Sequence, residues 1–336
     1  MRRVLGRPSR RQFIQGGLGL VGIGLLAGCS RLAGPRQPPE TRRIGFLAQV
    51  PEPYHEALFA GLRELGYVEG ENLVVERRFA NGPLEKLPAL ASELMQLRVD
   101  VLVSGGAGTN VLRASEKIPT VVVQADAVDV GMVASLARPG GNVTGISVST
   151  PALATKRLEI LREACPSIAR VAVLDGGFGT ANQAQAIDAA ATKLGLTLRH
   201  YDMTRELGAR VPGSPTAFFD AIRGDRPEAL IVLDSSFMTL NRALITTFAA
   251  DRRLPAVYPQ RVFVDDGGWI SYGPNYADMY HRAASYVDKI LKGANPGEIP
   301  MEQPTSLDFV VNLKTSQALG LTVLSSVLQQ ATDVIQ

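Results

Sequence analysis

Short apolar segments alternate with amphipathic segments along most of this chain, beginning near residue 43. Apolar runs at Ile44–Ala48, Val99–Ser104 and Thr120–Gln124 have the length and composition of buried strands. Between them, the segments 54–65 and 84–97 carry leucines at helical spacing, which predicts amphipathic helices. Apolar strands that alternate with helices predict an α/β fold with a parallel sheet covered on both faces.

The same alternation begins again after Gly145–Ser149. We expect helices at 152–164, 181–194, 216–222 and 240–252, and strands at 170–174, 196–201, 229–233 and 256–258. A chain of 336 residues is long enough to bury the cores of two compact domains. The pattern therefore predicts two α/β lobes, each built on a parallel sheet.

Small or polar residues follow several of the predicted strands. In open α/β sheets, ligands bind outside the carboxyl ends of the strands, so two sheets that face each other would line a cleft from both sides. The candidate ligand-binding residues at these strand ends are Ser104, Gly105, Gly106 and Thr109 in the first series, and Asp175, Gly176, Phe178, Asp234, Ser235 and Phe237 in the second.

These residue types suit particular groups of a small ligand. The segment 104–109 runs from a strand into a helix, where free N–H groups would favour a carboxylate; the alternative is a plain strand-to-helix turn. Asp175 and Asp234 offer acceptors for an ammonium group, and Asp234 has the alternative role of capping the next helix. Phe178 and Phe237 would either stack on a ring of the ligand or pack in the core.

The N-terminus has the features of an export signal. Residues 1–28 contain five arginines and no acidic residue, and the apolar segment Ile14–Ala27 is too short to span a membrane. Ser9–Ile14 resembles the twin-arginine signal of proteins exported in the folded state, and Leu26-Ala-Gly-Cys29 resembles a lipobox. We expect lipidation of Cys29, with residues 29–42 as a proline-containing tether.

Removal of the signal changes the interpretation of charge. The whole chain has 35 basic and 32 acidic residues, but without the five arginines of the signal 30 basic residues remain, for a net charge of −2. The mature protein therefore has no excess of positive charge for nucleic acid. Cys165 is left without a partner and is expected in the core. We predict no catalytic residue, metal site or cofactor, because His55, His200 and His281 lack ligand spacing and no P-loop occurs.

Several longer strings resemble one protein family. They are Leu62–Gly70, Leu136–Gly145, Ser271–Asn275, Tyr286–Gly293 and Asn312–Leu321. Together they resemble the ABC-transporter substrate-binding lipoproteins, a family that includes tryptophan/tyrosine-type binding proteins. The resemblance implies a type I periplasmic-binding-protein fold, in which two Rossmann-like lobes are joined by a three-crossing hinge. It implies a first lobe of 41–148 with 269–299, and a second of 149–268 with 300–330.

The family resemblance also implies a function. It indicates a monomeric solute-binding protein outside the cytoplasmic membrane that closes on a small ligand, an aromatic amino acid or similar, and delivers it to an ABC permease with a separate ATPase subunit. The alternative is a sensor that presents its ligand to a membrane receptor. Family members often have Gly-Asp-Pro-Val in a cleft loop where this chain has Ala125-Asp-Ala-Val128, so Asp126 is a candidate with an altered turn. The remaining ligand-binding candidates are Gln49, Tyr258 and Tyr272.

Overall fold

The computed structural model describes the chain from residue 41 to residue 336, except 82–83, 107, 112–117, 129–130, 178 and 205–215. The predicted export signal, the lipidation site Cys29 and the tether up to residue 40 lie outside the described residues. Phe178, one of the candidate ligand-binding residues, also lies outside them.

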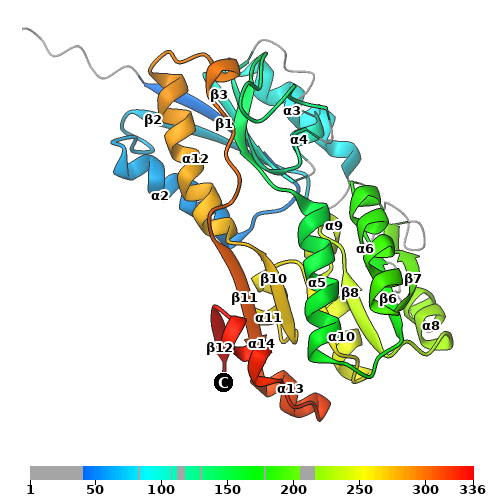
Figure 1. Ribbon diagram of the computed structural model, residues 1–336. Coiled ribbons are helices and arrows are strands. Elements are labelled where there is room, and N and C mark those ends of the chain that lie inside the picture. Colours follow the sequence, from blue (N-terminus) through cyan, green and yellow to red (C-terminus); the bar gives the residue numbers. More distant parts are fainter. Residues whose placement is uncertain are drawn as a thin grey trace, which may run out of the picture. The chain divides into compact units, whose positions relative to one another are not determined.

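The first sheet contains five parallel strands within the described residues, in the order β2-β1-β3-β4-β5 (Figure 1). The strands are β1 (Arg42–Ala48), β2 (Leu73–Phe79), β3 (Val101–Gly105), β4 (Thr120–Ala125) and β5 (Val143–Ser147). The helices that belong to this lobe are η1 (Pro53–His55), α2 (Glu56–Glu64), η2 (Leu84–Lys86), α3 (Leu87–Gln96), α4 (Gly108–Val111), α12 (Tyr276–Leu291) and η4 (Pro296–Glu298).

Helix α12 comes from far along the chain and packs against α2 on the first sheet (Figure 1). The approach is close at Gly61, where an added Cβ would lie 2.7 Å from the carbonyl oxygen of His281 and 2.9 Å from the Cβ of Ala284. A side chain at position 61 would therefore force the two helices apart. Because α12 belongs to this lobe, the first lobe is built from two separate parts of the chain.

The second sheet contains seven strands within the described residues, in the order β12-β11-β10-β9-β8-β6-β7. Its neighbours pair in parallel except β10 and β11, which are antiparallel. The strands are β6 (Arg170–Asp175), β7 (Thr197–Asp202), β8 (Ala229–Val232), β9 (Ala256–Tyr258), β10 (Ile270–Pro274), β11 (Leu307–Asn312) and β12 (Asp333–Ile335). The helices are α5 (Thr150–Ala164), α6 (Ala181–Leu194), α8 (Thr216–Gly224), α9 (Ser236–Leu240), α10 (Arg242–Asp251), α11 (Arg261–Asp265), α13 (Leu313–Leu319) and α14 (Ser325–Gln330).

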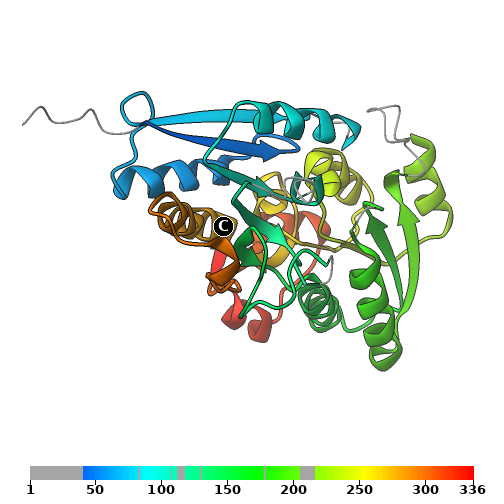
Figure 2. The same ribbon diagram turned by 90° about the horizontal axis from the view of Figure 1, so that it is seen from above.

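The chain passes between the sheets in three places within the described residues: from β5 to α5, from β10 to α12, and from η4 to β11 (Figure 2). The family resemblance predicts the return to the first lobe at residue 269. The hydrogen-bonded pairs of β10 with β9 and β11 keep it in the second sheet, so the crossing lies after Pro274. The second sheet also continues past residue 330, to β12. The two-lobe α/β fold itself is as expected.

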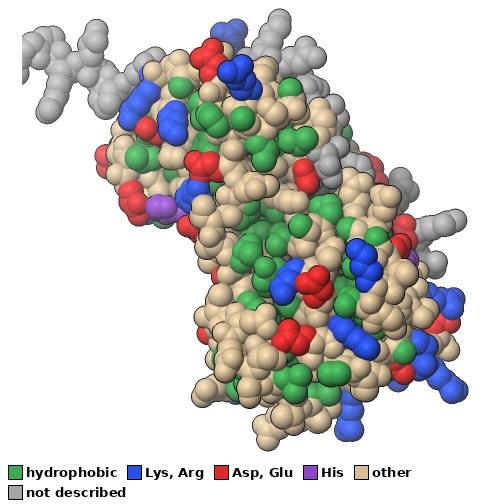
Figure 3. All heavy atoms as spheres, in the orientation of Figure 1, with side chains coloured by type: hydrophobic (Ala, Val, Ile, Leu, Met, Phe, Trp, Pro, Cys, Tyr) green, Lys and Arg blue, Asp and Glu red, His purple; other side chains and the backbone are tan. Residues whose placement is uncertain are grey.

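Each sheet has its own core. Trp269, 1% exposed, packs in the second core and donates a 2.7 Å hydrogen bond from Nε1 to the hydroxyl of Ser316. Cys165 lies in the same core as expected, and its burial raises the pKa of the thiol to about 11. At the surface, acidic and basic side chains are interspersed on the face that Figure 3 shows. Because each sheet buries its own apolar core, burial of apolar side chains supplies most of the stability of both lobes.

Candidate ligand-binding site

A pocket lies between the two lobes and takes residues from both. The first lobe supplies residues that follow β1, β3 and β4, and the second supplies residues that follow β6, β8 and β9. The strand-end residues that line it are Gln49, Gly105, Gly106, Asp126, Gly176, Asp234, Ser235 and Gln260, and Phe237 lines it from the first turn of α9. Other lining residues come from loops and helix starts: Glu52, Tyr54, His55, Leu84, Thr150, Gln183, Ser236, Thr239 and Tyr276. The arrangement matches the rule that ligands bind at the carboxyl ends of parallel strands.

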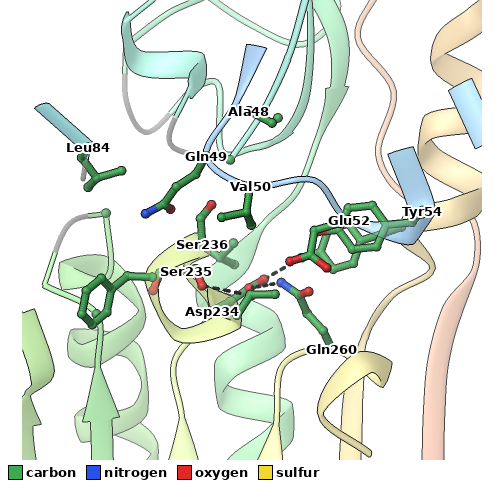
Figure 4. A pocket seen from close by; sticks show the side chains of 18 of the residues that line it. Ala48, Gln49, Val50, Glu52, Tyr54, Leu84, Asp234, Ser235, Ser236 and Gln260 are labelled. Carbon is green, nitrogen blue, oxygen red and sulfur yellow. Dashed lines mark hydrogen bonds between the residues drawn. The ribbon is translucent and has the colours of Figure 1, made fainter. Parts of the chain in front are cut away.

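Asp234 forms hydrogen bonds through both its side chain and its backbone at the wall of this pocket (Figure 4). Its Oδ1 accepts a 2.9 Å hydrogen bond from Gln260 Nε2, and its Oδ2 accepts a 2.7 Å hydrogen bond from the hydroxyl of Tyr276. Its backbone N–H and carbonyl bond to the side-chain amide of Gln183, at 2.9 and 2.8 Å. Burial and the nearby Asp234 charge hold the pKa of Tyr276 well above its usual range, so the phenol stays a donor.

Ser235, and not Asp234, caps the short helix α9. The hydroxyl of Ser235 accepts a 3.2 Å hydrogen bond from the N–H of Met238. The alternative that Asp234 acts as the cap is therefore wrong, and its carboxylate lines the pocket. Removal of Asp234 would leave Gln260 and Tyr276 without their acceptor, so the residue also contributes to the structure of the pocket wall.

A buried arginine lies behind Asp234. Arg157, on α5, is 0% exposed; its Nη1 donates to the carbonyl of Tyr272 at 3.3 Å and its Nη2 to Gln183 Oε1 at 3.4 Å. Burial lowers the pKa of the guanidinium, and the charge of Asp234 opposes that change. Arg157 thus supplies positive charge near the Asp234 carboxylate, and Gln183 joins the guanidinium to the backbone of Asp234.

Glu52 presents a buried carboxyl group to the other side of the pocket. Glu52 is 7% exposed, and neither of its carboxyl oxygens receives a hydrogen bond from the described residues. The N–H of His55 donates to the carbonyl of Glu52 at 3.0 Å and also faces the Glu52 side chain in a capping-box arrangement. Arg242 Nη1, from the second lobe, lies 3.5 Å from Oε1. Burial raises the pKa of Glu52, and Arg242 partly offsets the shift.

Aromatic rings form one wall of the pocket. The rings of Tyr54 and Tyr276 both line it, with centroids 5.4 Å apart, and Tyr280 stacks on Tyr54 at 5.5 Å. On the second lobe, Phe237 lines the pocket and also packs against the core around β8. The two roles expected for Phe237 are therefore compatible. Such rings supply flat apolar area beside the polar groups.

Several candidate residues of the first lobe and of strand β9 do not line the pocket. Ser104 is fully buried and its hydroxyl donates to the carbonyl of Leu47 at 3.0 Å, which joins β3 to β1. Thr109 is also fully buried. Tyr258 is 1% exposed and stacks on Phe263 with centroids 5.1 Å apart, because its side chain points to the core face of β9. These residues support the sheets rather than the pocket wall.

Asp175 and Tyr272 also have local partners. Asp175 accepts hydrogen bonds from the N–H of Gly177 at 2.7 Å and from the hydroxyl of Thr180, so its carboxylate stabilises its own turn. The ring of Tyr272 lies edge-on to Phe309 at 5.8 Å, in the second core. Neither lines the pocket. Among the described residues, no group of His, Cys, Asp and Glu could hold a metal ion.

A family model described as ABC transporter substrate binding protein matches residues 54–335. A tyrosine-binding protein from Clostridioides difficile is 22% identical over 323 residues, with 92% of each chain covered. A conserved domain protein from Vibrio cholerae is 24% identical, with a TM-score of 0.78 over 88% of this chain and 100% of the other. An ABC domain from Streptococcus pneumoniae in complex with L-Trp is 22% identical, with a TM-score of 0.77 and the same coverage.

Proposed function

The chain belongs to the family of ABC transporter substrate-binding proteins, and from that premise we propose that it is an extracytoplasmic lipoprotein that captures a small ligand for an ABC importer. One observation carries the proposal: the pocket takes its polar and aromatic residues from both lobes. A ligand that contacts both lobes stabilises the closed form, because only differential affinity for one form shifts the equilibrium. The chain has no P-loop, so ATP hydrolysis would occur on a separate subunit.

We further propose an aromatic amino acid, or a close analogue, as the ligand. The relatives that bind tyrosine and L-Trp support this class. The pocket supports it chemically, because Tyr54, Tyr276 and Phe237 offer surfaces for a ring beside carboxylates and the hydroxyls of Ser235 and Thr150. Those polar groups suit the charged end of an amino acid. The protein would return this ligand unchanged to the permease.

The ligand class can be tested by calorimetric titration of the purified protein with L-tryptophan and L-tyrosine. We expect at least one to bind with a dissociation constant near a micromolar, which corresponds to roughly −8 kcal/mol. Mass spectrometry of small molecules released from freshly purified protein gives an independent identification. Recovery of a sugar, together with no heat for either amino acid, would show that the amino-acid class is wrong while solute binding stands. An intact ligand after prolonged incubation would exclude turnover.

The anchor belongs to the same proposal. The predicted lipobox ends at Cys29, and the positively charged segment before it would direct export. Within the part of the chain that the structure describes, no helix is long and apolar enough to cross a membrane. Acyl chains contribute about 0.8 kcal/mol per buried methylene, so more than one chain on Cys29 would retain the protein firmly.

Cys29→Ala is expected to release the exported protein from the membrane without changing ligand affinity. The reason is that the substitution removes the acylated thiol and lies outside the pocket. Fractionation after a high-salt wash, with immunodetection, measures the effect. The buried Cys165 provides the matched control, because Cys165→Ala should leave the protein in the membrane fraction. Retention of the Cys29 variant in that fraction would rule out the lipid anchor.

A further inference from the structure

The side-chain amide of Gln260 has a fixed orientation in the pocket. An ionised carboxylate can only accept hydrogen bonds, so the 2.9 Å contact with Asp234 Oδ1 must involve the N–H₂ of Gln260. The amide oxygen is therefore turned away from Asp234. Gln260 is 4% exposed and lines the pocket, and its Oε1 receives no hydrogen bond from the described residues. By fixing the amide in this way, Asp234 leaves the amide oxygen of Gln260 as a buried acceptor for the ligand.

The carboxyl group of Glu52 is a second buried acceptor at the same end of the pocket. Figure 4 shows Glu52, Asp234 and Gln260 together at one end, with Leu84 at the other. Both carboxyl oxygens of Glu52 lack a hydrogen bond from the described residues, and the ion pair with Arg242 is long, at 3.5 Å. A buried acceptor without a donor lowers the stability of the folded protein by about 1–3 kcal/mol. Such an acceptor therefore indicates a place where a ligand supplies the missing donor.

We propose that Glu52 and Gln260 accept hydrogen bonds from a cationic N–H group of the ligand, such as an ammonium, and that Asp234 is a positioning residue that orients Gln260. This inference rests on the proposed solute-binding function and names the group that its ligand must carry. It assigns the ammonium to residues other than Asp234, whose carboxyl oxygens already accept from Gln260 and Tyr276.

The charge of the pocket agrees with a cationic group. Its described lining includes the carboxyl groups of Glu52, Asp126 and Asp234, but no lysine or arginine. His55 is neutral at physiological pH, because burial lowers the pKa of its ring to about 3. A ligand with an anionic group and no cation would bring further negative charge into this space. A ligand with an ammonium would instead donate to the oxygens of Glu52 and Gln260, and it would reduce a negative charge that Arg242 beside Glu52 and Arg157 behind Asp234 offset only in part.

Three related compounds test on the wild-type protein whether the ligand must carry a cationic N–H group. L-tryptophan carries both charged groups, tryptamine keeps only the ammonium, and indole-3-propionate keeps only the carboxylate. In calorimetric titrations we expect indole-3-propionate to bind roughly 10- to 100-fold more weakly than L-tryptophan, the range for hydrogen bonds to a charged group. A parallel thermal-shift panel of amines, amino acids, their hydroxy analogues and free sugars extends the test to other ligand classes.

Glu52→Gln tests the acceptor directly. We expect L-tryptophan to lose roughly 10- to 100-fold in affinity, and tryptamine to lose as much. The melting temperature of the free variant should change little, because the substitution removes a buried charge without a hydrogen bond and loses only the long 3.5 Å pair with Arg242, which keeps its 2.9 Å pair with Asp266. Glu56→Gln, at an exposed position at the start of α2, is the matched control and should bind as the wild type does.

Each outcome decides between the inference and the function. Equal binding of indole-3-propionate and L-tryptophan, or unchanged affinity of Glu52→Gln, would refute the inference and leave the proposed function intact. So would a panel in which only uncharged sugars bind. If Glu52→Gln lowers both the affinity and the melting temperature, Glu52 has a structural role, and the inference is refuted in that case as well. If no member of the panel binds, the proposed function fails and the inference with it.

Discussion

Arg157→Met is expected to lower the free energy of unfolding by about 3 kcal/mol, because it leaves two acceptors without their donor and the Asp234 carboxylate without a nearby positive charge. The substitution keeps a similar volume but removes the positive charge that faces Asp234. It also removes the donors to Gln183 Oε1 and to the carbonyl of Tyr272. Because Asp234 lines the pocket and is partly exposed to solvent, its unpaired charge should cost less than that of a fully buried carboxylate. Urea denaturation gives the measurement.

A double-mutant cycle identifies the source of this effect. Asp234→Asn alone should weaken the pocket, but in the Arg157→Met background it removes the uncompensated charge, so the two losses should not add. We expect a coupling energy of about 1–3 kcal/mol. Lys156→Met is the control on the same helix, because Lys156 has a 40% exposed side chain in a 3.8 Å surface pair with Glu159 and should change stability by less than about 0.5 kcal/mol. Additive losses would show that Arg157 acts by packing alone.

The hydrophobic pattern predicts the order of elements better than their ends. Helix α6 and strand β9 have the predicted bounds, 181–194 and 256–258. The predicted helix 240–252 corresponds to α10 (242–251), and the pattern does not predict the short α9 (236–240), which is separated from α10 by Asn241 alone. Ser235 caps the first helix, and the side chain of Asn241 bonds back to the carbonyl of Phe237 at 2.9 Å. Periodicity cannot reveal that break, because both helices bury residues of similar apolar character.

The position of β10 could not be predicted from local pattern. The segment 270–274, Ile-Ser-Tyr-Gly-Pro, is short and has no alternation of apolar and polar residues that would assign it to either sheet. Its partners β9 and β11 lie more than ten residues away on either side, so pairing depends on tertiary contacts. The antiparallel pair with β11 keeps it in the second sheet. The crossing therefore follows β10 rather than preceding it.

The rule that ligands bind at the carboxyl ends of parallel strands predicts much of the pocket, and it also applies to Gln260, which is not among the candidates predicted from the sequence. It points to Asp234 and Gly176, which line the pocket. Gln260 obeys the same rule two residues after β9, but Tyr258 is more conspicuous because it is aromatic. Tyr258 lies inside β9 and packs on Phe263 in the core, whereas Gln260 lies beyond the end of the strand, where the chain reaches the pocket.

The other missed residues follow no rule of spacing. Glu52 precedes a short 3₁₀ helix, and Gln183 lies on the third position of α6, 51 residues from its partner Asp234. Their roles depend on which helix ends meet across the cleft. Gln183 and Arg157 are polar residues on the apolar face of a helix, and both are almost fully buried. That position in the pattern is the one signal of their role that the sequence offers. Such residues need partners when buried, but the sequence does not identify those partners.

His55 is expected to make the protein lose stability between pH 6.5 and pH 4.5. Its ring is 4% exposed and lies within 5.0 Å of the rings of Phe46, Tyr54 and Tyr280, measured between centroids. Burial lowers the pKa of the imidazole from 6.5 to about 3. The Nδ1 atom accepts a 3.1 Å hydrogen bond from the N–H of Glu52, so the proton of the neutral ring lies on Nε2. Protonation would break this bond and place a charge among aromatic rings.

The sign of the effect follows from the two pKa values of His55. Above pH 6.5 the imidazole is neutral in both the folded and the unfolded chain, so the residue adds no pH dependence. As the pH falls below 6.5 the unfolded chain takes up a proton that the folded protein refuses, and stability falls by up to about 1.4 kcal/mol per pH unit. By pH 4.5 the loss is roughly 2.5 kcal/mol. Glu52 acts in the opposite direction, because burial raises its pKa and favours the protonated carboxyl in the folded state.

Denaturant unfolding at several pH values, compared with His55→Asn, isolates the contribution of His55 from that of the carboxyl groups. Asparagine keeps an acceptor for the N–H of Glu52 but does not titrate, so the variant should show a flatter decline between pH 6.5 and 4.5 even if it is less stable at pH 8. The proton resonance of the His55 ring should not shift over the same interval. A ring that titrates near pH 6.5 would mean that water reaches it in the folded protein. Because His55 fixes the backbone of Glu52, ligand affinity should fall with stability at low pH.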